Sequence, residues 1–184
     1  MKRTPTSTMA RVTEPGADAA VAMPGPVTVR PATVEDVPEI LAMIRELAEY
    51  ERSLPEVTAT EEQLRSTLFG DQPKVFGHVA VEDATGRVVG MAIWFLSYST
   101  WLGAHNLYLE DLYVRPEARG AGVGRLLLRT LAQICVERGY PRFEWWVLDW
   151  NPARDFYAAI GADALTEWIP YRVDGEELRR LAGG

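Results

Sequence analysis

The apolar positions along the chain follow two spacings, and each spacing predicts one kind of element. Segments rich in β-branched and aromatic residues, several of which alternate apolar with polar positions, predict strands. These segments are residues 27–32, 74–82, 87–98, 107–114, 142–148, 164–168 and 171–174. Apolar residues spaced three and four apart predict helices. The helical segments are residues 33–51, 60–69, a stretch that follows the glycines at 120–124 and ends near 138, residues 152–161 and residues 176–182.

Local signals agree with this order of elements. Thr60 and Gln63 have the spacing of a capping box, and Asn151 followed by Pro152 is typical of a helix start. The turn D-A-T-G at 83–86 predicts a hairpin between the strands on either side, and residues 99–106 are expected to form a loop. Because helices are inserted between strands, the fold class is expected to be α/β, with a mixed sheet.

The chain is expected to hold one domain preceded by a tail. Residues 1–26 are rich in Thr, Pro, Ala and Gly and have no periodic apolar positions, so we expect a disordered tail. Residues 27–184 then form a single domain. No apolar run approaches the roughly 20 residues of a membrane helix, so we expect no membrane span. The single cysteine, Cys135, lies among apolar neighbours and fits an inert buried thiol in a reducing, cytoplasmic setting.

Charge and histidine content narrow the classes of function. Asp and Glu number 26 against 19 Lys and Arg, which leaves a net charge of −7. Such a balance argues against a nucleic-acid partner and is compatible with a cationic ligand. His78 and His105 have no partners at metal-ligand or triad spacing, so no metal site is expected.

The stretch R-P-E-A-R-G-A-G-V-G-R-L-L-L at residues 115–128 carries the most specific chemistry. No lysine follows the last glycine, which excludes a P-loop, and the third glycine of a dinucleotide fingerprint is missing. The pattern that remains is Arg-x-x-Gly-x-Gly at Arg119, Gly122 and Gly124, where a strand leads into a helix. Glycines let phosphate oxygens approach the unpaired N–H groups of a first helical turn, so the pattern predicts a pyrophosphate site.

This stretch resembles the acyl-coenzyme A motif of the GNAT N-acetyltransferases, and the chain is most similar to the diamine (spermidine/spermine) N-acetyltransferases. The resemblance runs from about residue 27 to the C-terminal helix. V-R-P-A-T, R-E-L-A-E-Y-E, L-Y-L-E-D-L-Y-V and W-N-P-A-R-D-F-Y also carry it. It implies a GNAT-type, mostly antiparallel twisted sheet of six or seven strands, with helices on both faces and a splayed central parallel pair. It also implies acetyl-coenzyme A as cofactor, a small cationic amine as substrate and a homodimer.

The resemblance assigns roles to individual positions. The coenzyme would be held by Leu112, Tyr113, Val114, Arg119, Gly120, Ala121, Gly122, Val123, Gly124, Arg125, Asn151, Pro152 and Ala153. The amine would lie among Tyr50, Glu51, Glu110, Glu144, Trp145 and Trp146. Trp101 is a further candidate for lining this cleft or a dimer surface, and of Trp145 and Trp146 one is expected in the core.

The chemistry of acetyl transfer supports two catalytic candidates. An alkylammonium must lose its proton before it attacks a thioester through a tetrahedral intermediate, and the departing thiolate benefits from a proton. Tyr157 suits the acid, because a phenol stays protonated at neutral pH. Glu110 and Asp111 should point to opposite faces of their strand. We expect Glu110 in the cleft, as substrate anchor or as a base acting through water.

Some positions depart from the diamine acetyltransferases. Ser99 stands where they have an acidic residue, A-A-I-G-A replaces a basic segment, and N-P-A-R is one residue shorter. A lysine-like amino acid or a small diamine is therefore at least as well supported as a long polyamine. Two alternatives remain, a protein or peptide N-acetyltransferase and a non-catalytic acyl-coenzyme A-binding regulatory module.

Overall fold

The computed structural model describes residues 25–183, which form two compact units, residues 25–145 and residues 146–183. The two units are described separately. Apart from residues 25 and 26, the expected tail lies outside the described residues. No helix within residues 25–183 is long and apolar enough to cross a membrane.

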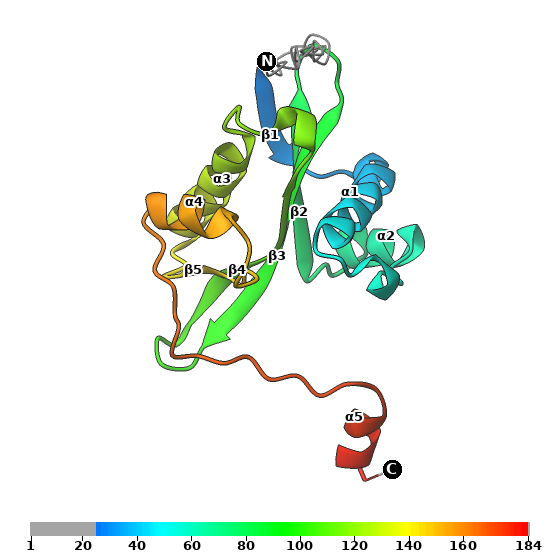
Figure 1. Ribbon diagram of the computed structural model, residues 1–184, viewed down its shortest axis with the longest axis vertical. Helices are drawn as coiled ribbons and strands as arrows, with labels where there is room; N and C mark the ends of the chain where they lie inside the picture. The colour runs from blue at the N-terminus through cyan, green and yellow to red at the C-terminus, as the bar shows by residue number, and fades with distance from the viewer. Residues whose placement is uncertain (1–24, 184) are drawn as a thin grey trace, which may run out of the picture. The chain divides into compact units, whose positions relative to one another are not determined.

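The first unit is built on one five-stranded sheet (Figure 1). Its strands follow the chain in spatial order: β1 (Val27–Pro31), β2 (Val75–Glu82), β3 (Val88–Ser99), β4 (Ala104–Val114) and β5 (Phe143–Trp145). The first four pair antiparallel, and β5 pairs parallel to β4. The parallel pair is possible because the chain crosses over through a helix between β4 and β5.

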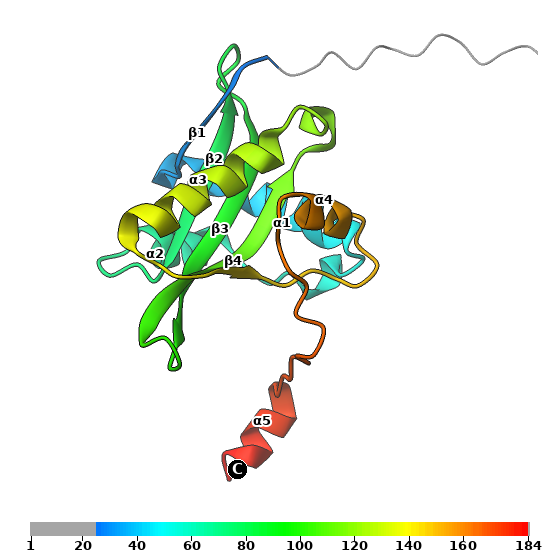
Figure 2. The same cartoon turned by 90° about the vertical axis from the view of Figure 1, so that its left-hand side faces the viewer.

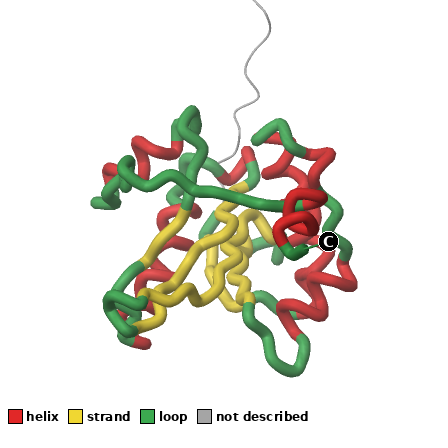
Figure 3. The backbone as a smooth tube through the Cα atoms, turned by 90° about the horizontal axis from the view of Figure 1, so that it is seen from below, coloured by secondary structure: helices red, strands yellow, loops and turns green. Residues whose placement is uncertain are grey.

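Helices cover both faces of this sheet, as the resemblance implied. α1 (Val37–Tyr50) and α2 (Glu61–Phe69) lie on one face and α3 (Val123–Arg138) on the other (Figures 1 and 2). Seen from below, the strands run between helical segments (Figure 3). Short 3₁₀ turns at Val34–Asp36, Leu54–Glu56 and Pro116–Ala118 join these elements. The Thr60 and Gln63 capping box is present at the start of α2.

Each face carries its own apolar core. The core under α1 and α2 consists of Ile40, Met43, Leu68, Val79, Val88, Met91, Ile93 and Tyr113. The buried residues of α3 are Val123, Leu127, Leu128, Leu131 and Cys135. A Cβ added at Gly90 of β3 would lie 3.4 Å from Leu127, so α3 packs closely against the middle of the sheet. Cys135 is buried, as expected.

A β-bulge in β4 decides which side chains reach each face. Asp111 pairs with Ile93 and Leu109 pairs with Trp94, so Glu110 between them has no direct partner. Paired residues in a ladder point to the same face. Asp111 therefore shares the α1 face with Ile93, whereas Leu109 shares the α3 face with Trp94. One inserted residue reverses the alternation of the strand.

The second unit contains two short helices, α4 (Ala153–Ala159) and α5 (Gly175–Leu181). Residues 164–168 and 171–174, expected as strands, are not strands, and the described chain has five strands where six or seven were expected. These segments form no hydrogen-bonded ladder, and an apolar alternating segment becomes a strand only with a partner. The loop expected at 99–106 is also shorter, because the ladder continues to Ser99 and Ala104.

Candidate active site

The turn before α3 is formed by glycines in a left-handed conformation. The backbone angle φ is +78° at Gly120 and +82° at Gly122, a region that residues with a Cβ atom rarely adopt. Gly122 caps α3, so the first N–H groups of the helix follow it directly. These groups have no acceptor inside the helix. A Cβ at either glycine would meet no atom within 4 Å, so the turn also has open space beside it.

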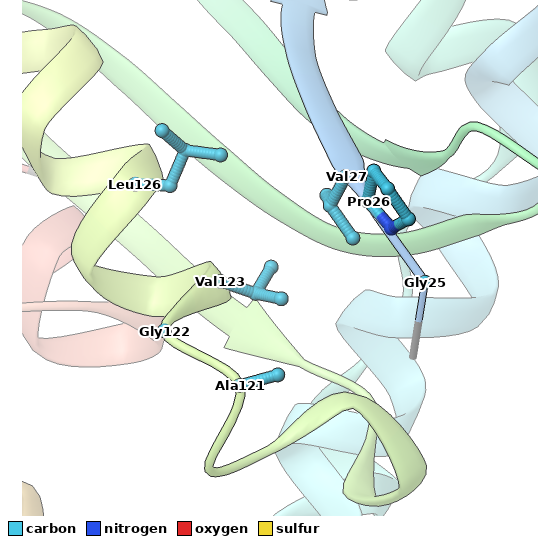
Figure 4. Close-up of a pocket in the computed structure, with 7 residues that line it drawn as sticks. All are labelled: Gly25, Pro26, Val27, Ala121, Gly122, Val123 and Leu126. Atoms are coloured by element: carbon cyan, nitrogen blue, oxygen red, sulfur yellow. The ribbon is translucent and has the colours of Figure 1, made fainter. Parts of the chain in front are cut away.

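A depression of about 330 Å³ lies next to this turn. Figure 4 shows Ala121, Gly122 and Val123 on one side of it and Pro26 and Val27, from the start of β1, on the other. The side chains that line it are apolar. The depression leaves room for a ligand against the turn without moving a large side chain.

The parallel strands β4 and β5 are paired over only part of the length of β4. β5 pairs with β4 only through Leu107, Tyr108 and Leu109. Within the described residues, β4 continues from Glu110 to Val114 with no ladder partner on the edge that faces β5. Backbone groups of this edge need partners, so the open stretch can pair with an extended ligand. This is the splayed parallel pair that the resemblance implied.

Arg119 contacts two tyrosine rings at the start of the turn. Its Cζ atom is 5.6 Å from the ring centre of Tyr50, the last residue of α1, and 5.5 Å from that of Tyr113 on β4. Its Nε–H donates to the carbonyl of Val114 at 2.9 Å. A guanidinium within about 6 Å of a ring face is attracted to it, so these contacts hold Arg119 beside the glycines.

Carboxyl groups gather where β4 approaches the end of α1. Burial, and then the charges of Glu110 and Glu51, raise the pKa of Asp111 to about 6. Burial also raises the pKa of Glu51, the residue that follows α1. Glu110 itself is exposed at the bulge. A carboxyl with a pKa near 6 can hold a cation or accept a proton at neutral pH.

A second acidic group lies along the same face of the sheet. Glu144 pairs with Tyr108 in the register of β4 and β5, and Asn106 Nδ2 donates to Glu144 Oε2 at 3.2 Å. Burial, and then the charges of Glu110 and Glu144, raise the pKa of Tyr108 to about 12. Asn106, Tyr108, Asp111 and Glu144 therefore form a polar row on the α1 face.

Two of the residues expected at the amine lie elsewhere in this unit. Trp101 is 83% exposed in the turn between β3 and β4, at the opposite end of β4 from Val114. Trp145 pairs with Leu109 and packs on Phe143, with 5.1 Å between ring centres, so it lies on the α3 face. The structure groups neither with Glu51 and Asp111.

Five expected residues belong to the second unit. Trp146 is 68% exposed. Asn151 Oδ1 accepts from the N–H of Ala153 at 2.9 Å, which stabilises the start of α4 after Pro152. Tyr157 lies on α4, and its ring centre is 5.5 Å from that of Phe156. No group of three His, Cys, Asp or Glu side chains in the described residues could hold a metal ion.

The residue that the sequence reasoning undervalued is Asp111. The sequence analysis assigned its acidic neighbour Glu110 to the cleft, because simple alternation places only one of the two side chains there. The bulge turns Asp111 toward α1 and leaves Glu110 at the kink. The signal in the sequence is the shift of leucines from positions 107 and 109 to position 112 across the acidic pair.

Comparison with known proteins agrees with these features. Residues 39–162 match the model of the acetyltransferase (GNAT) family. The chain is 43% identical over 169 residues to a thialysine N-epsilon-acetyltransferase of Bos taurus, across 85% of this chain and 98% of that protein. It is 31% identical over 197 residues to an L-ornithine N5-acetyltransferase of Arabidopsis thaliana, across 83% of this chain and 86% of that protein.

A solved structure shares the fold. An integron cassette protein from the mobile metagenome of V. cholerae aligns with a TM-score of 0.71 and 28% identity, across 86% of this chain and 98% of that one. The family match covers more than half of the chain and includes β4, the glycine turn and α4. The chain therefore belongs to the GNAT family and is an acetyltransferase.

Proposed function

We propose that the protein transfers the acetyl group of acetyl-coenzyme A to a side-chain amine of a small cationic molecule, with a lysine-like or ornithine-like amino acid as the leading candidate. The carrying observation is the group of carboxyls around Asp111, on the strand that precedes the glycine turn. The likeness to a thialysine and an ornithine acetyltransferase supports this choice.

The coenzyme fits the turn and the open edge of β4. Acetyl-coenzyme A would supply the activated acetyl thioester. The N–H groups after Gly122, together with Arg119 and Arg125, would bind its pyrophosphate. The backbone of Leu112, Tyr113 and Val114 would pair with its extended arm, and Asn151, Pro152 and Ala153 are proposed for the same arm. Gly120, Ala121, Val123 and Gly124 complete the turn.

The amine fits the acidic residues near the bulge. Glu51, Glu110 and Asp111 provide negative charge at the end of α1, and Glu144 adds more along the same face of the sheet. A substrate with two cationic groups would be held at both ends. A neutral monoamine lacks the second contact and should bind more weakly. Trp101, Trp145 and Trp146 stay candidates for a wider substrate surface.

Three proton movements accompany the reaction. The ammonium loses one proton before its nitrogen attacks the acetyl carbon. When the tetrahedral intermediate collapses, the carbon–sulfur bond breaks, the nitrogen loses a second proton and the thiolate gains one. Asp111 or Glu110 would take up the first proton, directly or through water. The Tyr157 hydroxyl would donate the proton that the thiolate gains, since a phenol is protonated at neutral pH, and the second proton from the nitrogen would restore the hydroxyl.

A panel of acceptors tests this proposal. Thiol release from acetyl-coenzyme A is measured with thialysine, ornithine, spermidine, a neutral monoamine and a lysine-containing peptide. We expect thialysine and ornithine to have the highest kcat/KM. The highest value for the peptide would favour protein acetylation, and the highest value for spermidine would favour a polyamine. If no acceptor causes thiol release, the remaining alternative is a non-catalytic module that binds acyl-coenzyme A.

We also propose that the protein is a homodimer, as its resemblance to the diamine acetyltransferases implies. Light scattering coupled to size-exclusion chromatography tests this directly. Twice the mass of the 20.5 kDa chain is expected, and a single chain mass would contradict it.

A further inference from the structure

We propose that Tyr50 is a positioning residue for Arg119, and that with Tyr113 it holds the guanidinium ready for the diphosphate of the coenzyme. The inference rests on the coenzyme site proposed above. It assigns Tyr50 to the coenzyme site, whereas the sequence analysis expected Tyr50 at the amine substrate. It also predicts that the end of α1 serves both ligands, with Tyr50 on one and Glu51 on the other.

The first step compares Arg119 with its neighbour Arg115. Arg115 contacts Glu39 at 2.8 Å and Glu46 at 3.3 Å, and its Nη1 donates to the carbonyl of Val88 at 3.0 Å. Its charge is already balanced by two carboxylates that tie β4 to α1. Within the described residues, Arg119 forms no ion pair with a carboxylate. Its positive charge is therefore available to an anionic ligand.

The second step concerns the contacts that Arg119 does make. One of its five N–H donors bonds to the Val114 carbonyl. The two rings contact the guanidinium through their faces. These contacts do not use the other N–H donors of Arg119, which an anion would need. The contacts with Tyr50 and Tyr113 thus restrain the side chain and leave donors for a diphosphate.

The third step is the benefit of that restraint. A long arginine side chain loses rotamer freedom when it binds an anion, and that loss weakens binding. Tyr113 is only 6% exposed and is fixed in the core under α1. Tyr50 is 39% exposed, so replacing it removes the ring contact with little effect on the core. Tyr50 is therefore the position where the restraint can be tested.

The experiment measures the dissociation constants of coenzyme A and of pantetheine, which lacks the diphosphate, by isothermal titration calorimetry on the full chain. We compare Tyr50→Leu, which removes the ring, with Tyr50→Phe, which keeps it. Tyr140→Leu is the matched control, because Tyr140 follows α3 at the end opposite the glycine turn. Arg119→Met and the double variant with Tyr50→Leu complete a mutant cycle.

The expected result is specific. Loss of one ring contact at an exposed site corresponds to a rise of about two- to fivefold in the dissociation constant of coenzyme A for Tyr50→Leu. Tyr50→Phe and Tyr140→Leu should stay near wild type, and pantetheine binding should not change. In the Arg119→Met background, Tyr50→Leu should have no further effect.

Three results would overturn the inference. The first is an unchanged dissociation constant for coenzyme A with a raised KM for the amine, which returns Tyr50 to the substrate. The second is an equal loss for pantetheine, and the third is full additivity with Arg119→Met. A wild-type protein that binds coenzyme A no better than pantetheine would instead contradict the proposed diphosphate site itself, and the inference would fall with it.

Discussion

The indole N–H of Trp94 donates to Nδ1 of His78 at 3.1 Å, and both side chains are buried on the α3 face of the sheet. Burial, and then the positive charge of Arg138, lower the pKa of His78 below 6.5. The ring is therefore neutral and accepts the bond, and a proton on Nδ1 would break it.

This pair predicts that His78 contributes a loss of stability in mild acid. Below about pH 6.5 the unfolded chain binds a proton at His78 more readily than the folded one does, so the contribution of His78 to the free energy of unfolding falls as the pH falls. His78→Gln keeps an acceptor but cannot titrate, and should flatten this dependence between pH 5 and 7. Urea unfolding across that range measures it. An identical slope in the variant would show that other groups cause the acid sensitivity.

Asp111 predicts opposite effects on activity and stability. If its anion serves the amine, kcat/KM should rise with pH through about 6, and Asp111→Asn should lower kcat/KM and remove that rise. Its folded pKa lies above the usual 3.8, so the folded state binds the extra proton and stability falls as the pH rises from about 4 to 6. At pH 7 the asparagine variant should gain roughly 1–3 kcal/mol in urea unfolding.

Asp83→Asn provides the control for this experiment, because Asp83 is exposed in the turn between β2 and β3. Its pH–rate profile should match that of the wild type. A variant Asp111→Asn that is less stable at pH 7, or that keeps the wild-type profile, would contradict the role given to Asp111.

Gly122→Ala should damage the turn through its backbone. Because φ is +82° there, a Cβ introduces strain of about 1 kcal/mol even though it meets no neighbouring atom. We expect a higher KM for acetyl-coenzyme A with a smaller change in kcat, together with a modest loss in melting temperature. Gly103→Ala, at another open position with a left-handed φ of +64° in the turn between β3 and β4, should lower the melting temperature in the same way and leave this KM unchanged.

Tyr157→Phe removes the proposed acid and keeps the ring. General acids contribute about 100-fold or more to rate, so kcat should fall by about that factor while the dissociation constant of coenzyme A stays close to wild type. Stopped-flow thiol release and calorimetry measure the two quantities. Phe156→Leu on the same helix serves as a comparison for packing effects. Unchanged turnover in Tyr157→Phe would remove the acid role.

The order of elements was predictable because it depends on local signals. The capping box at Thr60, the left-handed glycine after α3 at Gly139 and the hairpin turn at 83–86 act within a few residues of chain. The glycine turn before α3 was predictable for the same reason. Its glycines and the leucines that follow are adjacent in sequence, and two of the glycines have a positive φ in the turn before α3.

Features that depend on distant partners were not predictable. Residues 164–168 alternate well enough for a strand, yet pairing, and not alternation, makes one. The contact of Arg119 with Tyr50 joins residues 69 positions apart and requires the packing of α1 against β4. The raised pKa of Asp111 likewise depends on burial and on Glu51, neither of which a sequence pattern reveals.

The bulge at Glu110 shifts the alternation of side chains along β4 by one residue. Before it, odd-numbered residues such as Leu107 and Leu109 face α3, and after it, even-numbered residues such as Leu112 do so. Deleting Glu110 would restore regular alternation and leave Leu109, Asp111 and Leu112 on the faces that they already occupy, because Glu110 is the residue without a direct partner. The bulge thus adds one acidic residue at an exposed kink of β4 without moving any core side chain to the other face of the sheet.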